Sequence, residues 1–497
     1  MSSFNHPFLN KLQINNSLLA LVRDGEKYLY KDLLDRAKYI LENVLNTIDG
    51  NTKNAIAIVD NFSGELNLDS IAMILAGIEK SLIIAPINDD SELEYKLKSG
   101  EINFIFQNCK IKTINKEKNK NSLFDKLGKN SGLIIFSSGS TGNPKAILHN
   151  LDLLLSKYMN KKNKKINVLA SLLFDHIGGL NTMFSTFCMG GSLIIPKSRK
   201  DPYEIARLIE EFNINLLPTS PTLLNLLLIS GAYQRYNLDS LKLITYGTES
   251  MSESLLNRLK KTFPKVRFKQ SFGTSEIGIA SSNGDLLINI TDMDYKIINN
   301  ELFIKSPTQS IGYLNASNEV FKDGYFPTGD IVNVISKNNK EYLHIVGRKK
   351  DLINIGGEKV LPQEIENILL QMPSIKDCLV YKESNPITGE SVSVKVISDL
   401  NLNNMELKKE IRKFCKDKLA PYKIPTKVII VDSINATNRG KKHRNGGGSK
   451  RLSKVLFREL TLYLVQNDCL LDNFLYLDYI FSSKTPNKLY ESLKAAA

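Results

Sequence analysis

The sequence predicts an α/β protein whose large N-terminal domain is built from mainly parallel β-sheets flanked by helices. Short runs of Ile, Val, Leu and Ala have the length and composition of buried strands, at residues 54–59, 81–86, 132–135, 214–218 and 241–247. Stretches with apolar residues at helical spacing separate them, at residues 66–76 and 202–212. Strands that alternate with helices in this way are typical of parallel sheets with helices on their faces.

A second, smaller domain is predicted to begin near residue 347. Its expected helices and strands lie at residues 362–371, 377–381, 392–397, 404–418 and 427–432, which suggests a small, mobile α+β domain. Residues 446–449, Gly-Gly-Gly-Ser, have the composition of a flexible linker, and residues 452–481 carry Leu, Tyr and Phe at near-helical spacing. The predicted division is a large domain over 1–347, a small lid domain over 348–445, and a linker with a helical extension of unknown role over 446–497.

The composition is that of an ordinary globular protein, with 42% hydrophobic and 24% charged residues in 497. The N-terminus lacks the pattern of a secretory signal peptide and no run of about eighteen apolar residues occurs, so we expect a cytoplasmic protein without a membrane span. The net charge is +14, but the lysine-rich residues 110–120 contain no aromatic residue, which favours a solvated surface over nucleic-acid binding. The five cysteines are scattered without a C-x-x-C pair, which disfavours a disulfide framework and a zinc site.

A loop of small, hydroxylated and glycine residues follows the strand expected at residues 132–135. Its sequence, FSSGSTGNPK at residues 136–145, contains Ser138, Gly139, Ser140, Thr141, Gly142 and Lys145. Glycines let backbone N–H groups approach an anion closely, and hydroxyls and one lysine add donors and charge, so the loop suits phosphate oxygens. The spacing differs from that of a Walker P-loop, and the same pattern, taken alone, also occurs in flexible surface loops.

Further motifs follow this loop in a fixed order. They are LFDHIGG at 173–179, SFGTSE at 271–276, GYFPTGD at 324–330, GRKKDLI at 347–353 with PQEIE at 362–366, and TNRGKKHR at 437–444. This order resembles the adenylate-forming superfamily, which comprises acyl- and aryl-CoA synthetases, non-ribosomal peptide synthetase adenylation domains and firefly-type luciferases. The resemblance covers about residues 10–445.

The resemblance implies an enzyme that uses ATP and Mg²⁺ to turn a carboxylic acid into an acyl-adenylate, with release of pyrophosphate. A thiol then takes the acyl group, either coenzyme A or the phosphopantetheine arm of a carrier protein. Because the chain has no G-x-[DH]-S-L signature, any carrier is expected to be a separate protein. Two alternatives stay open: an amino-acid adenylating enzyme that loads such a carrier, and a non-catalytic nucleotide-binding relative.

The resemblance also implies how ATP and Mg²⁺ are held. The loop at 138–145 corresponds to the segment that holds the β- and γ-phosphates. Glu276 is expected to bind Mg²⁺, a cation that prefers oxygen ligands. Ser275 stands where Thr is usual and is expected to reach the α-phosphate. Phe272 replaces the usual Tyr and is expected to stack on adenine, and Gly273 follows it in the nucleotide site.

Four charged residues match further nucleotide-binding and catalytic positions. Asp330 is expected to accept hydrogen bonds from both ribose hydroxyls, which one carboxylate can do with its two oxygens. Arg348 is expected to add a ribose or phosphate contact. Lys441 matches the catalytic lysine that bridges the substrate carboxylate and the α-phosphate, with Arg444 as the arginine of the same motif. Asn435-Ala436 stand where Pro-Arg is usual in that motif.

Three residues match positions that serve the second, thiol-dependent step. Lys350 occupies the hinge at which the small domain swings between its two poses. Gly356 and Gly357 match the loop that lets the pantetheine arm pass, where a side chain would obstruct it. The same glycine pair also suits an ordinary turn.

The acid pocket is expected near Asp175 and His176, and the sequence leaves its chemistry open. An aspartate here pairs with the α-amino group in amino-acid-activating relatives, whereas a histidine here positions the acid in acyl- and aryl-CoA ligases. A third reading makes Asp175 the cap of a helix that starts near His176. The other expected wall positions are Tyr246, Gly247, Thr248 and Thr274.

Overall fold

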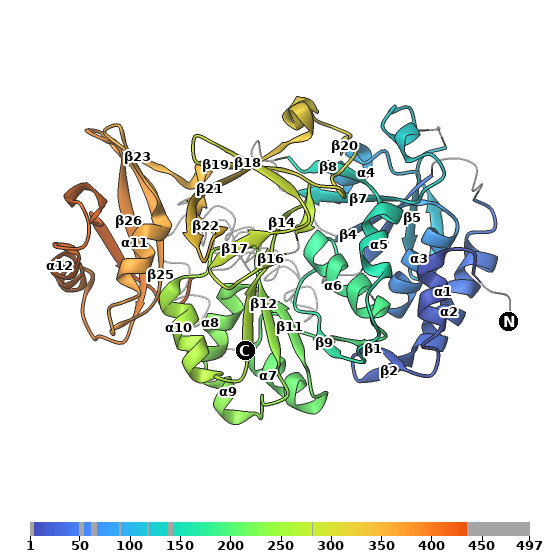
Figure 1. The fold of residues 1–497 in the computed structure, drawn as a ribbon, viewed down its shortest axis with the longest axis horizontal. Helices are drawn as coiled ribbons and strands as arrows, with labels where there is room; N and C mark the ends of the chain where they lie inside the picture. Colours follow the sequence, from blue (N-terminus) through green and yellow to red (C-terminus); the bar gives the residue numbers. More distant parts are fainter. Residues whose placement is uncertain are drawn as a thin grey trace, which may run out of the picture. The chain divides into compact units, whose positions relative to one another are not determined.

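The computed structural model describes residues 4–48, 54–60, 67–88, 91–116, 119–137, 143–280 and 282–434 (Figure 1). Contacts divide the chain into two compact units, Met1–Arg444 and Asn445–Ala497, and every described residue belongs to the first. The helical extension expected at residues 446–497 lies outside the described residues. The expected borders between the three domains stay predictions.

One seven-stranded sheet contains the strands that flank the glycine-rich loop. Its strands are β3 (Ala55–Asp60), β4 (Ile83–Asn88), β5 (Phe104–Gln107), β6 (Lys110–Thr113), β7 (Gly132–Ser137), β8 (Lys145–Asn150) and β20 (Gly312–Tyr313). Their spatial order is β20-β8-β7-β4-β3-β5-β6. The central pairs β3–β4, β3–β5 and β4–β7 are parallel, while β6, β8 and β20 join antiparallel.

A second seven-stranded sheet is parallel apart from its first hairpin. Its strands are β1 (Leu19–Arg23), β2 (Glu26–Leu29), β9 (Asn167–Leu169), β10 (Ser192–Ile195), β11 (Leu216–Thr219), β12 (Leu243–Tyr246) and β13 (Arg267–Gln270). Their order is β13-β12-β11-β9-β10-β1-β2, with only β1–β2 antiparallel. The carboxyl ends of β11, β12 and β13 therefore meet at one edge of this sheet, where ligands of α/β folds commonly bind.

Five helices pack between these two sheets. They are α1 (Pro7–Gln13), α2 (Tyr30–Tyr39), α3 (Leu68–Glu79), α5 (Leu151–Met159) and α6 (Ile177–Cys188). One core cluster joins them to both sheets, since it contains Leu21 and Leu193 of the second sheet together with Ile56 and Leu133 of the first. The second sheet's other face packs against α7 (Pro202–Glu211), α8 (Pro221–Ile229), α9 (Ala232–Arg235) and α10 (Glu253–Thr262) (Figure 1).

A third sheet of six strands is antiparallel throughout, which the sequence pattern did not anticipate. Its strands are β16 (Ser282–Asn283), β17 (Leu287–Ile290), β18 (Asp294–Ile298), β19 (Glu301–Lys305), β21 (Phe326–Lys337) and β22 (Lys340–Arg348). A hairpin of β14 (Phe272–Thr274) and β15 (Gly278–Ala280) precedes it. The short elements α4 (Leu93–Ser99), the π-helix η1 (Ile40–Val44), and the 3₁₀ turns η2 (Phe124–Leu127) and η3 (Glu319–Gly324) complete this part of the chain.

The last described segment forms a five-stranded sheet with two helices. It contains β23 (Ile353–Ile355), β24 (Glu358–Val360), α11 (Pro362–Leu369), β25 (Ile375–Asn385), β26 (Gly389–Ser398), α12 (Asn404–Cys415) and β27 (Lys427–Ile430), with the 3₁₀ turns η4 (Lys349–Asp351) and η5 (Pro421–Lys423). These residues have a core cluster of their own. The elements expected here, and the α/β class as a whole, are confirmed.

Capping residues explain where the expected helices begin. The side chain of Asn67 accepts a hydrogen bond from the Ser70 backbone N–H, so α3 starts at Leu68, two residues later than its apolar pattern predicts. At α7 the Asp201 side chain accepts from the Tyr203 N–H, and Pro202 occupies the first helical position. Apolar periodicity thus identified these helices, while the capping residues determine where they begin.

Two contacts bring α6 and the β14–β15 hairpin into close association with their neighbours. Gly179, in the first turn of α6, lies so near the preceding loop that an added Cβ would stand 2.0 Å from the Leu173 carbonyl oxygen. On β8, the fully buried His149 lies with its Nε2 2.7 Å from the Ser275 carbonyl oxygen. A carbonyl only accepts, so Nε2 carries the hydrogen and donates it.

The close approach at Gly179 predicts that Gly179→Ala destabilises the protein. The clashing atom belongs to the backbone, so relief requires a shift of α6, and we expect a loss of roughly 2–3 kcal/mol in the free energy of unfolding. Gly178→Ala is the matched control, because its Cβ would meet only the flexible Leu172 side chain, at 3.2 Å. Urea unfolding measures both variants, and equal losses would contradict the prediction.

The burial of His149 predicts a pH-dependent contribution to stability. Burial lowers the pKa of His149 from 6.5 to about 4, so the unfolded chain binds a proton there at a higher pH than the folded chain does. The stabilising contribution is complete above about pH 6.5 and is lost at about 1.4 kcal/mol per pH unit as the pH falls towards 4. The difference in unfolding free energy between the wild type and His149→Gln, measured from pH 7.5 to 4.5, should follow this slope. Parallel pH profiles would show that His149 does not titrate in this way.

Candidate functional site

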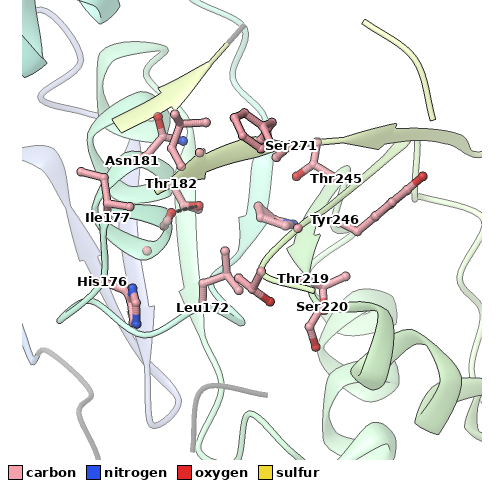
Figure 2. Close-up of a pocket in the computed structure, with 18 of the residues that line it drawn as sticks. Leu172, His176, Ile177, Asn181, Thr182, Thr219, Ser220, Thr245, Tyr246 and Ser271 are labelled. Atoms are coloured by element: carbon pink, nitrogen blue, oxygen red, sulfur yellow. Dashed lines mark hydrogen bonds between the residues drawn. The ribbon is translucent and has the colours of Figure 1, made fainter. Parts of the chain in front are cut away.

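A cavity of about 1070 Å³ opens where α6 faces the carboxyl ends of the parallel strands β11, β12 and β13. In Figure 2, His176, Ile177, Asn181 and Thr182 stand along α6, opposite Thr219, Thr245 and Ser271 at the strand ends. The cavity brings together twelve of the residues expected to form the site: His176, Tyr246, Gly247, Thr248, Phe272, Gly273, Thr274, Ser275, Glu276, Asp330, Arg348 and Lys350.

The loops after β11 and β12 form one wall of the cavity. Gly247 lies so close to residue 271 that an added Cβ would stand 2.9 Å from the Ser271 carbonyl oxygen, and Thr248 has a positive φ of 69°. The Tyr246 ring extends away from the other labelled side chains (Figure 2), and its hydroxyl donates to the Asp285 carbonyl. Thr219 is only 1% exposed, and its hydroxyl has no hydrogen-bond partner among the described residues, so it can serve a ligand.

The segment at 271–276 is fixed from several sides. The Thr274 hydroxyl accepts from the Glu276 backbone N–H at 3.2 Å, which forms a tight turn after β14. The Tyr313 hydroxyl donates to Glu276 Oε1 at 3.0 Å. Burial and the adjacent Glu276 carboxylate both raise the pKa of Tyr313, so its hydroxyl keeps its proton as a donor. Nothing in the sequence pattern pointed to Tyr313 or His149, since both reach this segment from distant strands.

Lys145 reaches the same region without lining the cavity. Its Nζ lies 4.6 Å from the centre of the Tyr313 ring, whose hydroxyl donates to Glu276. Lys145 begins β8 and pairs with Ser137, which ends β7 and lines the cavity. The two ends of the glycine-rich loop are thus located, whereas Ser138, Gly139, Ser140, Thr141 and Gly142 lie outside the described residues.

Asp330 and Arg348 form an ion pair on neighbouring strands. They stand opposite each other in the β21–β22 register, with Arg348 Nε 2.9 Å from Asp330 Oδ1. The Asp330 side chain is 5% exposed and that of Arg348 is 37% exposed. A buried carboxylate requires such a partner, and the pair leaves the carboxylate as an acceptor on the cavity wall.

Asp175 and His176, which the sequence left undecided, have different environments. His176 is the N-cap residue of α6 and lines the cavity, and its side chain makes no capping hydrogen bond. Asp175 does not line the cavity; its Oδ2 accepts a hydrogen bond of 2.9 Å from Asn88 Nδ2 at the end of β4. The reading that Asp175 caps the helix is wrong, because the cap position belongs to His176. Arg199, over the Phe174 ring at 5.1 Å, also lines the cavity and was not anticipated.

The residues expected to serve the thiol step are separated. Lys350, in η4, lines the cavity. Gly356 and Gly357 do not line it; they form the turn between β23 and β24, with φ values of 59° and 98°. Such angles favour glycine by themselves, which accounts for the pair as a turn. Lys441 and Arg444 lie outside the described residues.

The described ranges contain neither a membrane-spanning helix nor a metal-binding cluster of acidic, His and Cys side chains. None of the helices in them combines the length and the hydropathy needed to cross a bilayer. Within the same ranges, no cluster of three or more His, Cys, Asp or Glu side chains is arranged to hold a metal ion by itself.

Known ligases are similar to this chain in sequence. An indoleacetate–CoA ligase of Aromatoleum aromaticum is 28% identical over 337 residues, which span 62% of this chain and 65% of that protein. A 2-succinylbenzoate–CoA ligase of Bacillus licheniformis is 28% identical over 345 residues, spanning 63% of this chain and 69% of that protein. The matched part of this chain thus spans about two thirds of the length of these relatives.

Solved structures share the fold at low sequence identity. An anthranilate CoA ligase in complex with anthranoyl-AMP matches with a TM-score of 0.73 at 16% identity, covering 91% of this chain and 98% of that chain. An o-succinylbenzoate CoA synthetase from Bacillus subtilis, in complex with an acyl-adenylate intermediate, matches with a TM-score of 0.65 at 19% identity, covering 88% and 97%.

Two family profiles assign most of the sequence. The profile described as AMP-binding enzyme matches residues 15–314, and the profile described as AMP-binding enzyme C-terminal domain matches residues 364–441. The first match alone covers more than half of the chain. The protein therefore belongs to the AMP-binding enzyme family, as its ordered motifs predicted.

Proposed function

We propose that this protein activates a carboxylic acid with ATP, forming an acyl-adenylate and pyrophosphate, and then transfers the acyl group to coenzyme A. The observation that carries the proposal is that Glu276, Asp330, Arg348 and His176 line one and the same cavity. Membership of the AMP-binding family and the names of its CoA-ligase relatives support the same reaction.

In the first step an oxygen of the acid attacks the α-phosphorus of ATP, and the bond to the departing pyrophosphate breaks. In the second, the thiol sulfur attacks the acyl carbon, and the bond to AMP breaks. The protein's contribution to the first step is chiefly positioning and neutralisation of charge.

The polar groups of the cavity fit the parts of a nucleotide. Glu276 is suited to Mg²⁺, because Tyr313 orients one of its oxygens and leaves the other available for a cation. Ser275 and Thr274 supply hydroxyls beside it, and Phe272 with Gly273 offers a surface for adenine. The Asp330 carboxylate, held by Arg348, is suited to ribose hydroxyls.

Further residues, some of them outside the described ranges, complete the proposal. The loop from Ser138 to Gly142, with Lys145, is assigned to the outer phosphates of ATP. Lys441 is assigned to the carboxylate and the α-phosphate, with Arg444 beside it. Lys350 is assigned to the hinge between a large domain over 1–347 and a small domain over 348–445, and Gly356 with Gly357 to the thiol path.

The acid is proposed to be an aryl or acyl acid rather than an amino acid. His176 lines the cavity, whereas the Asp175 carboxylate is engaged with Asn88, so the aspartate is not available for an α-amino group. The relatives named for indoleacetate and 2-succinylbenzoate support aryl acids. A carrier protein as acceptor, a docking role for residues 446–497 and a cytoplasmic location stay predictions without such support.

Exchange of labelled pyrophosphate into ATP tests the first step directly. With the full chain and a panel of aryl, fatty and amino acids, we expect exchange that depends on an aryl or acyl acid. Lys441→Ala should lower the exchange rate by about a hundredfold or more, because it removes the charge assigned to the transition state. Lys442→Ala, the adjacent lysine, is the matched control and should stay close to wild type. Binding of ATP without exchange for any acid would instead identify a non-catalytic relative.

A further inference from the structure

One end of the cavity is lined by lysines that the nucleotide chemistry does not use. Lys157 lies in the last turn of α5, Lys161 follows that helix, and Lys269 lies on β13; all three are half-buried and line the cavity. The α6 residues beside them are polar as well: Asn181, Thr182 and Ser185. An apolar aromatic ring alone would find few suitable partners on such a wall.

The ammonium groups are held in place by neutral partners. Lys157 Nζ donates to the Ile279 carbonyl at 2.7 Å, and Lys161 Nζ donates to Ser185 Oγ at 2.6 Å. The Asn181 side chain is fixed on the same side, because its Oδ1 accepts from the Tyr158 hydroxyl at 2.6 Å. These bonds orient the cations while each keeps further donors for a ligand.

The charge of this group is poorly balanced. Burial lowers the pKa of Lys161; the nearby Cys188 opposes this shift, and the neighbouring cations Lys164, Lys269 and Lys11 lower the pKa further. Burial also lowers the pKa of Lys157, opposed by the carboxylate of Asp292, which lines the cavity too. Three lysines thus line the cavity, Asp292 offsets part of the charge of Lys157, and a bound anion would offset the repulsion that remains.

The lysine group begins near the expected reaction centre and extends away from it along the cavity. Lys157 contacts Ile279, which pairs with Gly273 across the β14–β15 hairpin, so the group begins beside the segment at 271–276. Ser185, the partner of Lys161, is nine residues beyond His176, the N-cap of α6, which corresponds to about 13.5 Å along the helix. An acid that spans this distance would carry its second polar group to Lys161.

We propose that Lys157, Lys161 and Lys269 bind a second anionic group at the far end of the acid, so that the preferred substrate is an extended dicarboxylic acid. This inference rests on the proposed adenylation, in which the other carboxylate reacts. A charge-assisted hydrogen bond to Lys161 gives the second carboxylate its selectivity.

Two acids that differ by one carboxylate test this proposal: 4-phenylbutanoate and 4-(4-carboxyphenyl)butanoate. For each, the dissociation constant is measured by calorimetry and kcat/KM by ATP–pyrophosphate exchange, with the full chain. The wild type should favour the diacid by about ten- to a hundredfold in both measurements. Lys161→Met should bring the ratio of diacid to monoacid close to one, whereas Lys161→Arg should retain part of the preference.

Lys162→Met is the matched control, because Lys162 is exposed and does not line the cavity. It should keep the wild-type ratio. Absence of a diacid preference in a wild type that exchanges the monoacid would overturn the inference and leave adenylation intact. Diacid binding that depends on Lys161, without exchange for either acid, would instead contradict adenylation and leave the anion site standing. If Lys161→Met weakened binding and lowered kcat/KM by the same factor for both acids, Lys161 would have a structural role only.

Discussion

The hydrogen bond from the buried His149 imidazole to the Ser275 carbonyl holds the centre of the candidate site in place. The segment at 271–276 leaves the parallel sheet at its carboxyl edge and has to present Glu276 and neighbouring hydroxyls to the cavity without regular pairing for every backbone group. A neutral histidine satisfies the carbonyl in an interior from which water is excluded. Tyr313 does the same for one oxygen of Glu276, so the carboxylate points in one direction before any cation or nucleotide binds.

Charge is distributed along the cavity in a way that suits a bipartite ligand. Near the segment at 271–276 lie two carboxylates, Glu276 and Asp330, of which the second is paired with Arg348. Towards the far end of α6 the lining turns basic through Lys161, which is bonded to Ser185, while Lys157 lies closer to the segment. A carboxylate suits magnesium and ribose hydroxyls, whereas lysines repel a cation and attract an anion. This polarity supports nucleotide binding at one end and an anionic acid at the other.

The sequence was informative where the determinants are local. Apolar runs predicted β3, β4, β7, β11 and β12, and twelve of the residues expected to form the site line one cavity. It failed for the antiparallel sheet, because strands such as β21 and β22 alternate too weakly at their exposed ends to be distinguished from loops. Tyr313 and His149 were missed for another reason: each reaches the site from a distant strand through tertiary packing, and a single sequence carries no signal for that. The sequence alone could not decide whether Asp175 or His176 lines the acid pocket. The two residues are neighbours, so a shift of one residue in the comparison with the family changes which side chain is expected to face the cavity.

The transfer of a labelled oxygen tests the acyl-adenylate most directly. An aryl acid carrying ¹⁸O in its carboxylate is incubated with ATP, Mg²⁺, coenzyme A and the full chain, and the released nucleotide is analysed by mass spectrometry. If the acid attacks the α-phosphorus, each AMP formed contains one ¹⁸O atom from the carboxylate. Label in inorganic phosphate, with ADP as the nucleotide product, would show attack at the terminal phosphorus and contradict the proposed chemistry.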